Sequence, residues 1–131
     1  MKYLYYRLWH SFEKIKTNDM PATNAMIFLT IWQFLNLSLV YILLKYYSIV
    51  EIEFELKSRN EIYLFSGVFY SILTIINYFF LYKNREKLNN KYKDESKRQK
   101  KVGNILLMLY IIGSFALVLY FGSKYTASIM N

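Results

Sequence analysis

The sequence predicts an all-α membrane protein with three transmembrane helices, an N-terminal amphipathic interfacial helix, and a short extended (β-like) segment in the external connector. Three runs without a charged residue carry this prediction: 20–44, 62–82 and 102–123. Each has at least the roughly 20 residues that a helix needs to cross a hydrocarbon core of about 30 Å. Charged residues gather between the runs, although 55% of the chain is hydrophobic and its net charge is +8. This segregation is typical of a single integral membrane domain, because a soluble domain distributes its apolar residues at helix or strand period.

Residues 1–19 are expected to form the interfacial helix. Apolar side chains recur there at helical spacing, and basic residues occupy other positions around the helix. The apolar set is Leu4, Leu8, Phe12 and Ile15, with Tyr5 and Trp9 beside it. A basic amphipathic helix of this kind suits the headgroup boundary of a membrane. It would either anchor the N-terminus or dock a partner, and Pro21 fits the first turn of the helix that follows.

The external connector, residues 45–61, contains the sequence VEIEFELK, in which apolar and charged residues alternate. This is the period of a half-buried β-strand. The apolar side of the external strand would consist of Val50, Ile52, Phe54 and Leu56. A single strand leaves its backbone groups unpaired, so the segment requires a partner strand. That partner would come from the residues that follow, from a second protomer or from another protein.

Residues 83–101 form a basic connector with nine Lys and Arg against three acidic residues. It is expected to prolong the second helix by a few turns, with a turn near KDES before the third span. It is either an ordinary determinant of topology or a contact surface for anionic headgroups or an acidic protein, and near a membrane each basic residue contributes about 1 kcal/mol. The candidate residues for contact with lipid headgroups or a partner are Arg85, Lys87, Lys91, Lys97, Arg98, Lys100 and Lys101. Nucleic acid is not an expected partner, because no aromatic stacking platform accompanies the charge.

The distribution of Lys and Arg also predicts the orientation of the chain. Residues 1–19 and 83–101 together hold thirteen, whereas the external connector and the tail 124–131 together hold four. Basic connectors stay on the cytoplasmic side of a membrane. The N-terminus is therefore expected in the cytoplasm and the C-terminus outside, across a bacterial inner (plasma) membrane.

The three apolar runs contain no Asp, Glu, Lys, Arg or His. Proton relays and ion-coupled transport use such groups inside the membrane, so a pump is not expected, whereas a passive oligomeric pore needs none. Small and uncharged polar residues instead recur at spacings that let helices approach and form hydrogen bonds. The predicted helix-packing residues, within one chain or between protomers, are Thr30, Gln33, Asn36, Gly67, Ser71, Thr74, Tyr110 and Gly113. Gln33 is the strongest single indication of contact between helices, since an amide near the middle of a membrane must find a hydrogen-bond partner.

Residue types that carry catalysis or bind metals are scarce in this chain. It has no cysteine, and its one histidine is His10. Metal sites need several converging ligands, and no glycine-rich phosphate loop or nucleophile motif occurs. The sequence therefore predicts no catalytic, cofactor or metal site, and no enzymatic activity.

Several stretches carry a resemblance to a known group of proteins. They are INYFFLYKNREKLNNKY (76–92), SKRQKKVG (96–103), LYIIGS (109–114) and YYRLWHSFEKIKTNDMPATNA (5–25), with FLN at 34–36. With these motifs the chain resembles small uncharacterised three-span membrane proteins of Bacteroidota. The resemblance implies three spans and a bacterial origin, and it implies no functional residue.

Taken together, these patterns favour a small integral membrane protein that acts as an interaction or accessory subunit, or as a membrane anchor for a partner. A homo-oligomer is compatible with the packing residues. The alternative is an oligomeric membrane-perturbing or pore-forming effector.

Overall fold

The computed structural model describes residues 1–47 and 58–130, and these form helices joined by turns, without a strand. The predicted external strand falls outside the described residues. Three helices are long and apolar enough to cross a membrane, at Pro21–Tyr46, Arg59–Tyr82 and Lys97–Ala127, which confirms the three predicted spans. The elements in chain order are α1 (Lys2–Glu13), α2 (Pro21–Tyr46), α3 (Arg59–Asn77), the π-helix η1 (Tyr78–Tyr82), α4 (Arg85–Tyr92) and α5 (Lys97–Met130).

α2, α3 and α5 begin at residues that suit the N-terminus of a helix. Pro21 occupies the first turn of α2, where its missing N–H costs nothing. Ser58 precedes α3, and its hydroxyl accepts a hydrogen bond from the N–H of Glu61 at 3.2 Å. At the start of α5, Ser96 and Gln99 form a capping box in which each side chain accepts from the other's N–H, at 3.2 and 2.8 Å. These caps explain why α3 and α5 start before the uncharged runs do.

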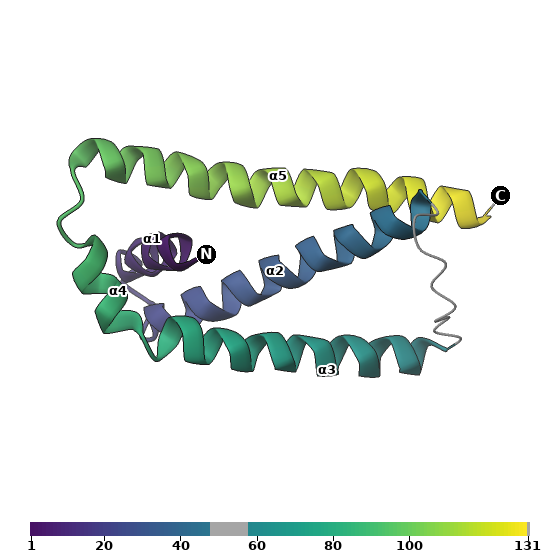
Figure 1. Cartoon of the computed structure of the whole chain (residues 1–131), viewed down its shortest axis with the longest axis horizontal. Helices are drawn as coiled ribbons and strands as arrows, with labels where there is room; N and C mark the ends of the chain where they lie inside the picture. Colours follow the sequence, from purple (N-terminus) through teal and green to yellow (C-terminus); the bar gives the residue numbers. More distant parts are fainter. Residues whose placement is uncertain (48–57, 131) are drawn as a thin grey trace.

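α2 is the central helix of the three spans. In Figure 1 it lies between α3 and α5 and runs obliquely, close to α3 at one end and to α5 at the other. The outer surfaces are strongly apolar: Leu64 of α3 is 71% exposed and Leu109 of α5 is 63% exposed. Exposed apolar surface on this scale needs a lipid or protein environment, which agrees with membrane insertion.

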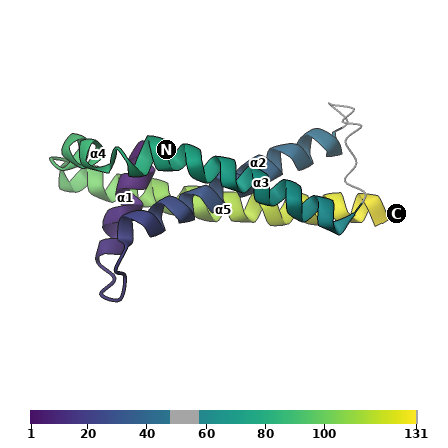
Figure 2. The ribbon, with the colours of Figure 1, turned by 90° about the horizontal axis from the view of Figure 1, so that it is seen from below.

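α1 is present as a helix, and it packs against the other helices of the chain. It ends at Glu13, which leaves Ile15 exposed beyond it. It lies across one end of the bundle, nearly perpendicular to the spans in Figure 2. Tyr5 and Leu8 are buried in the hydrophobic core, so the apolar side assigned to the headgroup boundary is covered by α2, α4 and α5. The structure therefore shows this side of α1 packed on other helices, and the placement of α1 at the headgroup boundary stays a prediction.

The basic connector also differs from a simple prolongation of the second helix. The chain turns at Lys83 and Asn84, where the Asn84 amide donates to the Phe79 carbonyl at 2.7 Å, and α4 then takes a new direction. Leu88 of α4 is 5% exposed and belongs to the core cluster. A straight continuation would carry Leu88 away from the bundle, whereas the turn brings it against α1. We call this end of the molecule, residues 1–16 and 83–101, the basic end.

Candidate functional site

Arg7 is the centre of a buried polar contact at the basic end. Its Nη1 donates to Glu95 Oε1 at 2.6 Å, and its Nη2 donates to Asn104 Oδ1 at 2.5 Å and to the Lys100 carbonyl at 3.3 Å. The side chains of Arg7 and Glu95 are only 8% and 6% exposed. Arg7 of α1 thus holds both the turn between α4 and α5 and the first turns of α5. We call this contact of Arg7, Glu95 and Asn104 the clamp.

Tyr3 extends the clamp by one turn of α1. Its hydroxyl donates to Glu95 Oε2 at 2.8 Å, and lies 3.2 Å from the carbonyl of Gln99. Burial raises the pKa of Tyr3 to about 12, and its hydrogen bond to Glu95 and the charge of Glu95 act in the same direction. The phenol therefore remains a donor at neutral pH. Its ring approaches α5 over Gly103, where a Cβ atom would come within 2.8 Å of Tyr3 Cζ.

Aromatic rings surround the clamp. The ring centroid of Tyr6 lies 4.4 Å from that of His10 in the same helix and 5.4 Å from that of Tyr92, and the second contact joins α1 to α4. Tyr5 is fully buried, and its hydroxyl donates to the Ala22 carbonyl at the start of α2. Burial raises the pKa of Tyr5 to about 12. These rings add apolar contact beside the buried charges.

The polar side of α1 faces α4 and borders an open pocket of about 440 Å³. His10 connects the two helices: its Nδ1 lies 2.6 Å from Glu13 Oε2, and its Nε2 lies 3.0 Å from Asn89 Oδ1. Lys93 and Lys100 reach the same pocket from the turn after α4 and from α5. The basic end therefore has a concave polar surface as well as a buried contact.

Inside the spans, Asn77 is the main polar contact. It is 5% exposed, and its amide donates to Thr30 Oγ1 at 2.9 Å and to Gln33 Oε1 at 2.5 Å. A second bond runs from the Asn36 amide to the Tyr110 hydroxyl at 2.7 Å. The first contact joins α2 to α3 and the second joins α2 to α5. An amide buried among apolar helices needs such partners, because its alternative is an unsatisfied polar group.

Among the described residues, the other predicted packing residues form no hydrogen bond to a different helix. Gly67 and Ser71 are exposed on α3, and the Ser71 hydroxyl donates to the Gly67 carbonyl of its own helix at 2.8 Å. Thr74 is half-buried, and its hydroxyl donates to the Tyr70 carbonyl. A Cβ on Gly113 would meet nothing within 4 Å. Of the eight residues, the structure brings Thr30, Gln33, Asn36 and Tyr110 into bonds between helices.

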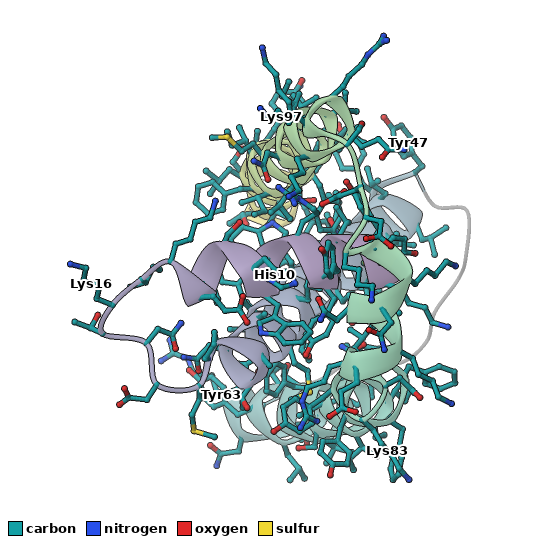
Figure 3. All side chains as sticks on the ribbon, turned by 90° about the vertical axis from the view of Figure 1, so that its left-hand side faces the viewer. His10, Lys16, Tyr47, Tyr63, Lys83 and Lys97 are labelled. Carbon is teal, nitrogen blue, oxygen red and sulfur yellow. The ribbon has the colours of Figure 1, made fainter. Side chains whose placement is uncertain are left out.

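The predicted headgroup-contact residues gather at the basic end. Figure 3 looks at this end: His10 lies near the middle on α1, and Lys16, Lys83 and Lys97 point outward around it. Arg85 is half-buried, with its guanidinium 4.5 Å from the centroid of the Tyr82 ring. The exposed members of the predicted set are Lys87, Lys91, Lys97, Arg98, Lys100 and Lys101. The external-strand residues Val50, Ile52, Phe54 and Leu56 lie outside the described ranges.

Sequence reasoning missed the clamp and the central position of Asn77. Arg7 carries a weak signal, because it follows Tyr3 by four residues and so shares its side of the helix. Its partner Glu95 lies among charged neighbours and carries no local signal. Asn77 is the only Asn or Gln in the run 62–82, and its need for a partner inside the membrane could have paired it with Gln33.

Across residues 1–47 and 58–130, no group of three or more His, Cys, Asp and Glu is arranged to hold a metal ion. The site is thus a set of cationic, hydroxyl and amide groups at one end of a three-helix bundle. Comparison of the chain with protein-family models, with curated proteins and with solved structures finds no match.

Proposed function

We propose that this chain is a non-enzymatic integral membrane protein that acts as an interaction or accessory subunit for a partner chain. It lies in a bacterial inner membrane with its basic end in the cytoplasm and its C-terminus outside. The observation that carries this proposal is the pair Gly67 and Ser71, which lies exposed on the apolar surface of α3.

Among the described residues of α3, only Asn77 is buried. Leu64, Val68 and Ile75 are 71%, 53% and 57% exposed, around the exposed Gly67 and Ser71. A small residue and a hydroxyl four positions apart let a second helix approach closely, and apolar neighbours supply its packing. This surface suits contact with a helix of another chain, which fits the predicted role of Gly67 and Ser71 between protomers.

The basic end supports the orientation. The thirteen Lys and Arg of residues 1–19 and 83–101 belong to α1, α4, the start of α5 and the turns between them. Two acidic residues of this end are already engaged, Glu95 with Arg7 and Glu13 with His10. The exposed charge is therefore strongly positive, as a surface beside an anionic cytoplasmic leaflet requires.

Cysteine cross-linking in native membranes tests the proposal, because the chain has no cysteine of its own. Ser71→Cys places a thiol on the exposed surface of α3, and Ile112→Cys places one on the exposed surface of α5 as a matched control. We expect a defined cross-linked product, with a second copy or with another protein, for Ser71→Cys and not for Ile112→Cys.

Equal products from both positions, or none from either, would contradict a contact through α3. A self-linked dimer from Ser71→Cys, together with membrane depolarisation on expression, would instead favour the pore-forming alternative.

A further inference from the structure

We propose that the polar pocket at the basic end binds a phosphate group. The pocket has a volume of about 440 Å³, and it is formed by α1, the chain after α4 and the start of α5. This size lies in the range of about 300–1,000 Å³ that is usual for small-ligand sites. The positively charged residues in its lining are Arg7, Lys14, Lys93 and Lys100.

The charge balance of the pocket favours an anion. Lys14, Lys93 and Lys100 come from three different parts of the chain, and all three are exposed. The one carboxylate in the lining belongs to Glu13, and it lies 2.6 Å from His10 Nδ1. Arg7 is already paired with Glu95. Three lysines around one carboxylate leave a positive pocket, and ammonium groups are common ligands of phosphate.

A buried donor without a partner points to the same ligand. Arg7 lines the pocket and is 7% exposed, and its Nε makes no hydrogen bond, although Nη1 and Nη2 do. Buried N–H groups are normally satisfied, so an unpaired one calls for an explanation such as an absent anion. The lysines can donate to a bound phosphate directly, whereas Arg7 Nε has almost no accessible surface and would donate only after the lining side chains move. The clamp would then serve both to hold α1 and to present this donor.

Two sources can supply the phosphate: a phospholipid headgroup, or a soluble phosphate compound of the cytoplasm. This inference adds a ligand to the proposed function. It rests on that function in one respect, the placement of the basic end beside the cytoplasmic leaflet. Lys100 lies two residues before the predicted start of the third span, which is the level of the headgroups. Figure 3 shows α1 and His10 from the end of the bundle, and the pocket beside them is open, which also leaves access for a soluble ligand.

The first experiment measures binding of inorganic phosphate by calorimetry to the full chain in nanodiscs of phosphatidylcholine only. The test variant is K14Q/K93Q/K100Q, and the matched control is K87Q/K97Q/K101Q, which removes three exposed charges of the basic end outside the pocket. We expect the test variant to weaken binding about tenfold or more, and the control to change it less than about threefold. All six lysines are exposed, so both variants leave the core intact.

The second experiment measures retention of phosphatidic acid by the same three proteins after purification, by native mass spectrometry. Pocket-dependent retention of the lipid without binding of inorganic phosphate assigns the site to a headgroup, and pocket-dependent binding of inorganic phosphate assigns it to a soluble ligand. Equal losses in the two triple variants, or no binding by the unaltered chain in either experiment, would overturn the proposal. Neither binding measurement needs a partner chain. A negative result in them is therefore distinct from a negative result in the cross-linking test.

Discussion

At the scale of single residues, the unusual feature is an arginine buried in the contact that holds α1. Arg7 bonds to Glu95, to Asn104 and to a backbone carbonyl. A lysine could not replace it, because only the planar guanidinium offers several donors in a fixed fork to acceptors on different elements. Burial of two charges is costly, and the geometry offsets that cost only while both partners are present.

Removal of one partner of the clamp should therefore destabilise the protein more than replacement of both. We expect Arg7→Met to lower the free energy of unfolding by about 3–5 kcal/mol, because it leaves Glu95 as a buried charge without its partner. The double variant R7M/E95M should recover a large part of that loss. Chemical denaturation in detergent measures both, and a double variant as unstable as the sum of its single changes would contradict this view of the clamp.

At the scale of elements, the close approach of α1 to α5 depends on one glycine. Gly103 has no side chain to collide with Tyr3, whereas Gly113 further along the same helix faces open space. Both glycines lie inside the same regular helix, but a methyl group added at Gly103 would collide with Tyr3 and one added at Gly113 would not. The absence of a side chain at Gly103 leaves room for the Tyr3 ring against the first turns of α5.

Gly103→Ala should separate α1 from α5. The new Cβ would lie within 2.8 Å of Tyr3 Cζ, so we expect a loss of about 1–3 kcal/mol of stability and faster proteolysis of residues 1–16. Gly113→Ala is the matched control, and it should be neutral or slightly stabilising because alanine is the better helix former. Similar effects at both positions would mean that helix propensity, and not the contact with Tyr3, determines the result.

The parts of the fold that local sequence determines were predicted, and the parts that depend on distant contacts were not. The three spans follow from uninterrupted apolar runs. Thr30, Gln33 and Asn36 could be predicted as packing residues because they are polar residues within such a run. The position of α1 depends on Arg7 meeting Glu95, 88 positions away in the chain. The change of chain direction before Leu88 was not predicted for the same reason. Leu88 packs against α1, which is distant in the sequence, and not against neighbouring turns of its own helix.

At the scale of the whole molecule, charge is unequally distributed between the two ends. The basic end carries thirteen Lys and Arg, and the described residues near the opposite end, 45–47, 58–61 and 124–127, carry Lys45, Arg59 and Lys124. Transmembrane orientation responds to this asymmetry, because basic connectors are retained on the cytoplasmic side. The molecule as a whole is therefore polarised along the direction of its spans.

Labelling of single cysteines in intact bacterial cells tests that orientation. We expect a membrane-impermeant maleimide to label Ala127→Cys in intact cells, and to label Asn90→Cys only after the cells are made permeable. Both positions are exposed in the structure, so burial does not limit the reaction. The reverse pattern would place the basic end outside and would contradict the proposed orientation.

The distance along the chain between the two sides of the clamp also sets an order for biosynthesis. Arg7 is made early, and Glu95 and Asn104 follow 88 and 97 positions later. At about 5–20 residues per second, the N-terminal helix waits on the order of 4–20 s before its partners exist. The last contact of the fold to form therefore involves α1, the segment that was made first, and it forms after the third span has begun to emerge. Until then, α1 of the nascent chain lacks its contacts with Glu95 and Asn104, so chaperones or proteases can reach it.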